Sequence, residues 1–496
     1  MLLRAGFLSL GLLLISRVLG LLRESALAAS FGTSGMGDVI VMMLTLPDWL
    51  ASMVSSGALA YVLLPVWARQ SREEQRHSRR QVSLWLLGVG MGLALALVVF
   101  ARPVYGWLLP GVGASLRSDT LVALWFSAIA TPLALLSACW STSLQHERDF
   151  VGMYFSNVLV NLTVILALVV SGATLWHQDA VEFVGAGLLV AMALRLLWLG
   201  YRMQRRLPAA APDVAPSQSQ CARTALPGAS VWVWAVLVAG LPLAFPFVAR
   251  SMASSSGEGA AALFNYAWKL IELPLVLAVQ LVATLSFPVI TRAFAGEGDV
   301  QAAIVRAFSV AWTLAVAAAA ALMIGAPAYA QVLFGWGKMS ADGLVAVGRW
   351  SSVGAWSLLP QALTAVALTV LATVGRIREM AWVYTVVLAL LLLGAPMVDG
   401  DGIRLMTALN MAYGLIAVAA FVLLGDTFRR FLPSGLLIST SVALVAVAVT
   451  KGLVPDVWWS SNYLLAIAWS VLVAIFMIVI AVTFSPALRL ALRRAS

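Results

Sequence analysis

The chain has 496 residues, of which 62% are hydrophobic and only 10% are charged, and its formal net charge is +10. Soluble domains carry about 25% charged residues, so this composition excludes a soluble globular domain and indicates a helical protein that crosses a membrane many times. The two cysteines, Cys139 and Cys221, are too few for a disulfide framework and lack the spacing of a metal site, so we expect no metal.

Apolar stretches long enough to cross a bilayer follow one another along the whole chain. The first carries Arg17 and Arg23 after its apolar run, where a cleaved signal peptide tolerates little charge, so it is interpreted as a retained span. The expected fold is an all-α polytopic membrane protein with about fourteen transmembrane helices. These predicted spans cover residues 6–29, 37–67, 82–109, 119–144, 150–172, 180–203, 230–250, 259–288, 304–334, 342–374, 379–398, 404–424, 434–453 and 463–484.

A linker divides the first twelve predicted spans into six and six. Residues 205–229 are rich in Pro, Ala and Ser, as connecting segments are. We expect an N-terminal six-helix lobe over 1–204, a C-terminal six-helix lobe over 230–430, and two further helices, spans 13 and 14, with a tail over 431–496. Because six is even, both lobes would enter the membrane from the same side.

Basic residues gather on one side of this predicted topology. If the N-terminus is cytoplasmic, the segments on the cytoplasmic side hold far more Lys and Arg than those outside, as membrane proteins generally show. Both termini are therefore expected in the cytoplasm. The net charge of +10 then reflects this orientation and contact with anionic phospholipids, and no nucleic-acid binding is expected.

The second span of each half repeats a proline pattern. Leu46-Pro47 is followed by Pro65, and Leu273-Pro274 is followed by Pro288. Prolines are common in membrane helices, so the pattern alone is a weak sign of an internal repeat.

Ionisable residues from three predicted spans reach similar depths in the membrane. A charge that faces lipid costs about 2.5–3.5 kcal/mol, so such groups usually face a cavity or one another. Structural ion pairs are one interpretation, and Lys269 and Glu272, three residues apart, are well spaced for such a pair.

An anionic ligand is the other interpretation. Arg17 has no nearby carboxylate in the sequence except Asp48, and this lack of a partner favours a bound anion. The planar guanidinium group suits phosphate. The residues concerned are Arg17, Arg23 and Glu24, then Asp38 and Asp48, then Lys269 and Glu272. Arg195 and Arg349 could line the cavity, but pairing or extension toward the membrane surface is the favoured interpretation.

The stretch "SRVLGLLRESALAASFG" and the residues that follow it, from Ser16 to Pro65, resemble the N-terminal signature of the MurJ/MviN lipid II flippases. This family belongs to the multidrug/oligosaccharidyl-lipid/polysaccharide (MOP) exporter superfamily. The stretch "NYAWKLIELP", residues 265–274, is similar to a second motif of the same family. The resemblance implies two six-helix lobes around a central cationic cavity, alternating access, and a groove at spans 13 and 14 for a polyprenyl tail.

The same resemblance implies roles for individual residues. Arg17, Arg23 and Lys269 match the cations that bind the substrate diphosphate. Glu24, Asp38 and Glu272 match acids that form gates or ion pairs, and Asp48 is expected to join an ion pair.

The chain also departs from the family pattern in its second span. Ala51 and Ser52 stand where the family has two arginines, Ser56 replaces a glutamate, and Asp48 replaces an asparagine. The cargo therefore stays open between lipid II and a polyprenyl-diphosphate-linked exopolysaccharide repeat unit.

The expected function is a flippase that moves such a lipid-linked oligosaccharide across a bacterial inner membrane. A drug or cation antiporter, a membrane enzyme and a non-transporting scaffold of polysaccharide export are the alternatives. No enzyme activity is expected, because the predicted topology has no large outer loop and no His within a span. No cofactor is expected, and the chain lacks the G-x-x-x-x-G-K-[ST] loop of an ATP site. The membrane potential or a coupling ion is the expected energy source. The oligomeric state stays open, with a monomer compatible with the sequence.

Overall fold

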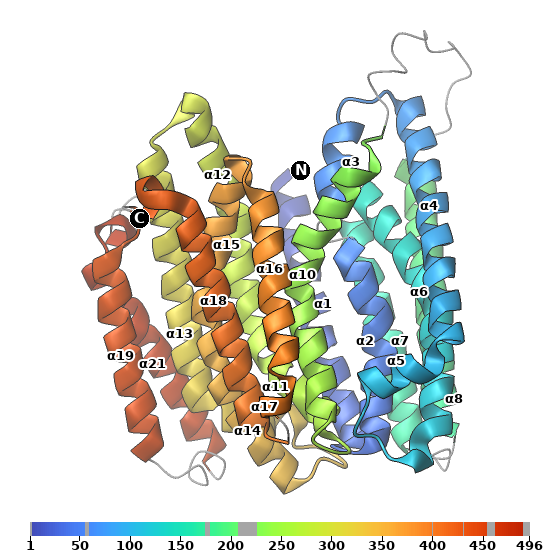
Figure 1. Ribbon diagram of the computed structural model, residues 1–496. Helices are drawn as coiled ribbons and strands as arrows, with labels where there is room; N and C mark the ends of the chain where they lie inside the picture. Colours follow the sequence, from blue (N-terminus) through green and yellow to red (C-terminus); the bar gives the residue numbers. More distant parts are fainter. Residues whose placement is uncertain are drawn as a thin grey trace. The chain divides into compact units, whose positions relative to one another are not determined.

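The computed structural model describes residues 2–54, 59–173, 179–206, 226–398, 400–429, 431–453 and 462–489, and these are almost entirely helical (Figure 1). Within these ranges there is no strand. The predicted all-α polytopic fold is confirmed. Most of the linker expected over 205–229, together with Ser56, lies outside the described residues.

Eleven helical segments within the described ranges are long and apolar enough to cross a membrane. They coincide with eleven of the predicted spans. Their helices are α2 (Gly35–Met53), α4 (Arg72–Val99), α6 (Arg117–His146), α7 (Phe150–Ala173), α8 (Ala180–Arg206), α10 (Ala229–Ser254), α13 (Val300–Phe334), α14 (Ala341–Gly354) continuing into α15 (Leu358–Thr373), α18 (Gly402–Arg429), α19 (Ser434–Leu453) and α21 (Tyr463–Phe484).

The other three predicted spans are also helical. The first, α1 (Leu2–Phe31), contains Arg17, Arg23 and Glu24. The second is broken into α11 (Ala260–Pro274), a π-helical turn η4 (Leu275–Gln280) and α12 (Leu281–Arg292). The third is the shorter α16 (Ile377–Leu393), followed by α17 (Ala395–Val398).

Short helices complete the described chain. They are α3 (Ala60–Trp67), α5 (Ala101–Leu108), the 3-10 turns η2 (Ala114–Leu116) and η6 (Ala355–Ser357), and the π-helical turn η5 (Ala293–Glu297).

The chain forms two compact units. The first comprises Met1–Phe247 with Gly257–Ala262, and the second comprises Val248–Ser256 with Leu263–Ser496. The lobe boundaries expected from the sequence stay a prediction.

In the first unit, glycines let the helices pack closely. A Cβ added at Gly90 of α4 would lie 2.6 Å from the Cα of Pro132 on α6, and one at Gly187 of α8 would lie 2.5 Å from the Cβ of Ala167 on α7. Such small-residue contacts are the usual way in which membrane helices approach each other. The result is a bundle in which α1 packs on α7, α4 on α6, and α8 on both α6 and α7.

In the second unit, the helices gather around α13, which is buried along most of its length. The last two long helices, α19 and α21, pack against it (Figure 1), and side-chain hydrogen bonds join them to it. Trp312 Nε1 donates to Thr440 Oγ1 at 2.7 Å, and the hydroxyls of Tyr329 and Ser470 lie 2.6 Å apart. Buried hydrogen bonds of this kind fix helices to each other where lipid leaves little hydrophobic driving force.

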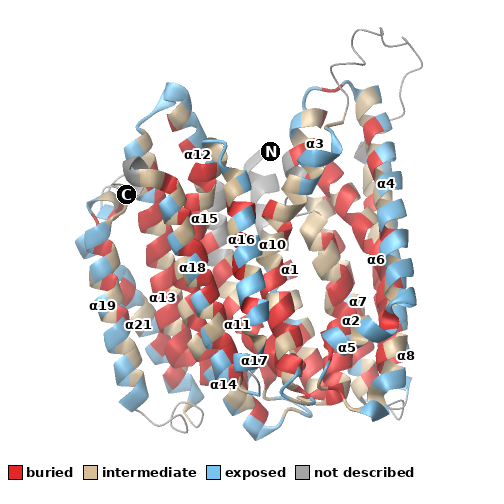
Figure 2. Cartoon of the chain, viewed as in Figure 1, coloured by how far each residue is buried: buried red, intermediate tan, exposed pale blue. Residues whose placement is uncertain are grey.

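Side chains on the outside of several helices are apolar. Figure 2 shows long exposed stretches on α4 and α19, where Leu84, Trp85 and Val99 of α4 are among the most exposed large hydrophobic residues. A large exposed apolar surface on long helices is what a lipid environment requires.

The proline pattern shared by the two halves coincides with a break in each helix. After α2 ends at Met53, Val54 and Leu59 have π-helical geometry, and α3 then contains Pro65. After α11 ends at Pro274, η4 is π-helical, and α12 then contains Pro288. Proline removes a backbone hydrogen-bond donor, which favours a break in a helix. Because π-helical turns often occur at functional sites, the second span of each half is a candidate part of such a site.

Candidate functional site

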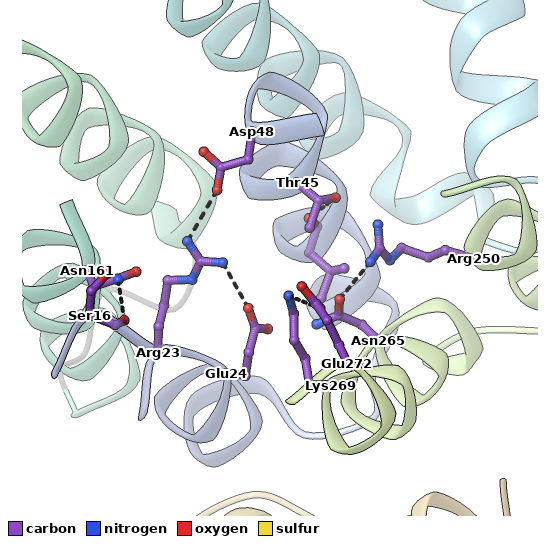
Figure 3. Close-up of polar contacts among 11 residues, drawn as sticks. Ser16, Arg23, Glu24, Thr45, Asp48, Asn161, Arg250, Asn265, Lys269 and Glu272 are labelled. Carbon is purple, nitrogen blue, oxygen red and sulfur yellow. Dashed lines mark hydrogen bonds and ion pairs between the residues drawn. The ribbon is translucent and has the colours of Figure 1, made fainter. Parts of the chain in front are cut away.

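Arg23 lies between two carboxylates inside the first unit. Its Nη2 donates to Glu24 Oε1 at 3.0 Å, and its Nη1 donates to Asp48 Oδ2 at 3.3 Å (Figure 3). Glu24 is on α1 and Asp48 is on α2, so the guanidinium joins the two helices. The side chains of Arg23, Glu24 and Asp48 are 12%, 3% and 37% exposed. Asp48 is therefore the most exposed residue of this ion-pair cluster.

The residue after Asp48 anchors this part of α2. Trp49 Nε1 donates to the carbonyl oxygen of Leu243 at 3.1 Å, and its ring stacks on Phe247 with centroids 4.1 Å apart. Helix α10 thus holds the residue next to Asp48 in α2.

Arg17 lies apart from this cluster. It is exposed on α1, about 9 Å along the helix axis from Arg23. It makes no ion pair with any residue that the structure describes, and its electrostatic neighbour is Tyr154 of α7. Asp48, the one carboxylate that the sequence offered to Arg17, is bonded to Arg23 instead.

Asp38 has backbone partners. Its Oδ2 accepts from Gly259 N at 2.7 Å and its Oδ1 accepts from Ala262 N at 2.6 Å, so it caps the beginning of α11. It is fully buried. Among the described residues it contacts no cation within ion-pair distance. Its expected role in a gate stays a prediction.

In the second unit, Lys269 and Glu272 form the predicted pair. Lys269 Nζ lies 2.7 Å from Glu272 Oε2, one turn apart on α11 (Figure 3). Both side chains are partly exposed. The role of Lys269 as a diphosphate ligand stays a prediction, as do the roles of Arg17, Arg23 and the acids.

Sequence reasoning missed the buried pair of Arg250 and Asn265. Arg250 Nη2 donates to Asn265 Oδ1 at 2.9 Å within the second unit, and both residues are buried. The predicted span 230–250 ends at Arg250, where an arginine normally reaches water. The signal was the run of small and hydroxyl residues after it, "SMASSS", which allows close helix packing.

The residues that depart from the family pattern leave α2 without basic side chains. Ala51 is buried and Ser52 is partly buried. Within the described ranges, no group of three or more His, Cys, Asp or Glu residues could hold a metal ion.

Comparisons with known proteins agree on one family. A family model described as lipid II flippase MurJ matches residues 27–480. A probable lipid II flippase MurJ from Rhizobium meliloti (strain 1021) is 26% identical over 356 residues, which cover 68% of this chain and 64% of that protein. Lipid II flippase MurJ from Burkholderia cenocepacia is 26% identical over 355 residues, covering 68% of this chain and 67% of that protein. The match thus spans about two thirds of these relatives' length.

Solved structures share the fold. Lipid II flippase MurJ in an inward closed conformation has a TM-score of 0.75 at 14% identity, covering 95% of this chain and 98% of that one. A multidrug resistance MATE family transporter of the MOP superfamily, in an inward-facing conformation, has a TM-score of 0.66 at 14% identity, with 89% and 98% covered. At these identities the likeness concerns the fold alone.

Proposed function

The chain belongs to the MurJ family of lipid II flippases, and from that premise we propose that it moves a polyprenyl-diphosphate-linked glycan precursor across the bacterial inner membrane, from the cytoplasmic to the periplasmic leaflet. Both termini would then lie in the cytoplasm. The cargo of first choice is lipid II, the substrate named for the family. An exopolysaccharide repeat unit carries the same diphosphate and polyprenyl groups.

The observation that carries this proposal is the Arg23 cluster in the membrane interior. A guanidinium at that depth is costly unless it is paired, and Glu24 and Asp48 supply the pairing in the absence of cargo. The Asp48 contact is the longer of the two, and Asp48 is the more exposed acid. A diphosphate, with several charged oxygens, can therefore take the place of Asp48 on Arg23 while Glu24 keeps the guanidinium in position.

Replacement of Asp48 by the diphosphate on Arg23 suits a transporter, which must release its cargo. The carboxylate that leaves Arg23 on binding remains nearby and competes for it again, which favours release on the other side. An inside-negative membrane potential favours outward movement of an anion by about 2.3 kcal/mol per charge per 100 mV. We propose that this potential or a coupling ion drives alternating access, with no covalent chemistry on the cargo.

Complementation tests the cargo. A strain depleted of its own lipid II flippase should grow when it expresses this chain, and should not grow with Arg23→Ala at equal abundance in the membrane. Failure of the wild-type chain to support growth, despite normal insertion, would argue against lipid II and for an exopolysaccharide unit. Efflux of cationic dyes by the same cells would instead support the antiporter function, which the family match does not favour.

A further inference from the structure

We propose that Arg195 of α8 is a further phosphate-binding residue of this site, which extends the proposed function and rests on it. The sequence favours pairing or extension toward the membrane surface for Arg195 and leaves a cavity-lining position open. No pairing is found among the described residues. Arg195 lies near the middle of α8 and forms no hydrogen bond or ion pair with any residue that the structure describes.

The depth of Arg195 matches that of Asp48. At 1.5 Å per residue, Arg195 lies about 22 Å from Ala180 at the start of α8, and Asp48 lies about 20 Å from Gly35 at the start of α2. Both helices begin at the same end of the first unit. Leu116, the residue just before α6, lies next to Gly35, where an added Cβ would be 2.6 Å from Leu116 Cδ1. Helix α7 leads back to this end before α8 begins.

Arg195 also lies on the same side as the Arg23 cluster. Helix α8 packs against α2, and the Asp48 carboxylate is the charge that acts on the Arg195 guanidinium. That carboxylate already accepts a hydrogen bond from Arg23 at 3.3 Å. One acid is therefore shared electrostatically by two guanidinium groups from different helices.

The donors of Arg195 are unused. Its Nε is buried and has no hydrogen-bond partner among the described residues. A desolvated cation with unpaired N–H groups is unfavourable, and the distant attraction of Asp48 does not satisfy those donors. A phosphate group between α2 and α8 would accept from them in the bidentate manner that guanidinium groups favour.

The charge balance of the first unit points the same way. Away from their ends, α1, α2 and α8 carry three arginines, Arg17, Arg23 and Arg195, and two acids, Glu24 and Asp48. Asp38 is occupied by the backbone N–H groups of Gly259 and Ala262. The local excess is positive, which suits a ligand with more than one negative charge.

Binding of undecaprenyl diphosphate to the purified full-length protein tests the proposal. Arg195→Ala should weaken binding about tenfold or more, because a hydrogen bond to a charged group is lost. Arg195→Lys should fall between this variant and the wild type, since it keeps the charge without the planar fork. Arg349→Ala removes an arginine of the second unit and serves as the matched control with wild-type affinity. Thermal melting of each variant identifies loss of fold.

A double variant separates ligand binding from a structural role. If Arg195 only neutralises Asp48, then Arg195→Ala combined with Asp48→Asn will bind undecaprenyl diphosphate as Asp48→Asn alone does, and the proposal is wrong. If Arg195 binds the cargo, the double variant stays weaker than Asp48→Asn alone. Equal affinity of Arg195→Ala and the wild type would also overturn the proposal, and the proposed function would survive if Arg23→Ala alone loses binding.

Two competitors identify the source of the phosphate. Inorganic pyrophosphate should displace undecaprenyl diphosphate from the wild type and much less from Arg195→Ala, whereas phosphatidylglycerol should compete poorly with both. Equal competition by phosphatidylglycerol would assign Arg195 to ordinary phospholipid and contradict the proposal. A wild-type protein that binds no undecaprenyl diphosphate would remove the proposed function itself, and this inference with it.

Discussion

Arg23 on α1 donates to Asp48 on α2 at 3.3 Å, and the same guanidinium bonds its neighbour Glu24 at 3.0 Å. The two acids differ in surroundings, since Glu24 is buried and Asp48 is 37% exposed. This difference in exposure suggests different roles for the two acids. In the proposed function, Glu24 holds the arginine in place and Asp48 competes with the cargo for it.

Replacing Arg23 by Ala should abolish transport and also lower stability. It leaves Glu24 buried without its partner, and removal of one member of a buried pair typically costs about 3–5 kcal/mol. The double variant Arg23→Ala, Glu24→Gln should regain most of the lost thermal stability, because the unpaired charge is gone. It should remain inactive in transport. Recovery of transport in this double variant would show that Arg23 acts only as a structural partner of Glu24.

Asp48→Asn should bind undecaprenyl diphosphate more tightly than the wild type. The amide accepts a weaker hydrogen bond than the carboxylate, so Arg23 is freer to bond the phosphate. Asp48→Glu, which keeps the charge, is the control and should bind close to wild type. Measured affinities of the two variants check this prediction, and weaker binding by Asp48→Asn would mean that Asp48 helps to hold the cargo.

Asp38→Ala should destabilise the protein through the beginning of α11. Two backbone N–H groups, those of Gly259 and Ala262, would lose their acceptor, and loss of a helix cap costs about 0.5–2 kcal/mol. Asp38→Asn keeps one side-chain oxygen and should lose less. Thermal melting compares them, and an unchanged melting temperature for Asp38→Ala would contradict the capping role.

Gly259→Ala should be more damaging than either Asp38 variant. Gly259 has a φ of 85°, and a Cβ there would lie 2.2 Å from the carbonyl oxygen of Thr33. Both the backbone conformation and the close approach require glycine. Gly257, which has a positive φ but open space around its position, is the comparison, and Gly257→Ala should be tolerated better. Equal melting temperatures of the two variants would show that the contact with Thr33 is not needed.

Trp312→Phe should loosen α19 from α13 without affecting the Arg23 cluster. It removes the 2.7 Å hydrogen bond to Thr440 while keeping an aromatic ring, and such bonds within membranes contribute about 0.6 kcal/mol on average. Hydrogen exchange of α19 should become faster, with exchange in α1 and α2 unchanged. Protection of α19 equal to that of the wild type would indicate that apolar packing alone holds the two helices together.

The sequence predicted features that depend on local spacing. The spans follow from runs of apolar residues, and the Lys269–Glu272 pair follows from a separation of one helical turn. The break in the second span of each half was not predicted. The paired prolines were a weak sign of an internal repeat, and prolines such as Pro132 and Pro327 lie within unbroken helices.

Contacts between distant parts of the chain were not predictable in the same way. Asp38 caps a helix whose first residues lie 221 and 224 positions later, and no periodicity encodes that contact. The partner of Asp48 could have been Arg17 or Arg23, and only the rotation of α1 against α2 decides it. Arg195 was expected to pair or extend, because its neighbours in sequence do not show that α8 packs beside Asp48.

Flipping of fluorescent lipid II in proteoliposomes tests the central claim most directly. The assay measures how fast lipid II becomes accessible in the opposite leaflet, with wild-type protein, Arg23→Ala, Glu24→Gln and the two combined. The wild type should accelerate flipping, Glu24→Gln should retain part of the activity, and both variants without Arg23 should match protein-free vesicles. Wild-type rates in the folded Arg23→Ala, Glu24→Gln protein would show that this guanidinium does not carry the diphosphate.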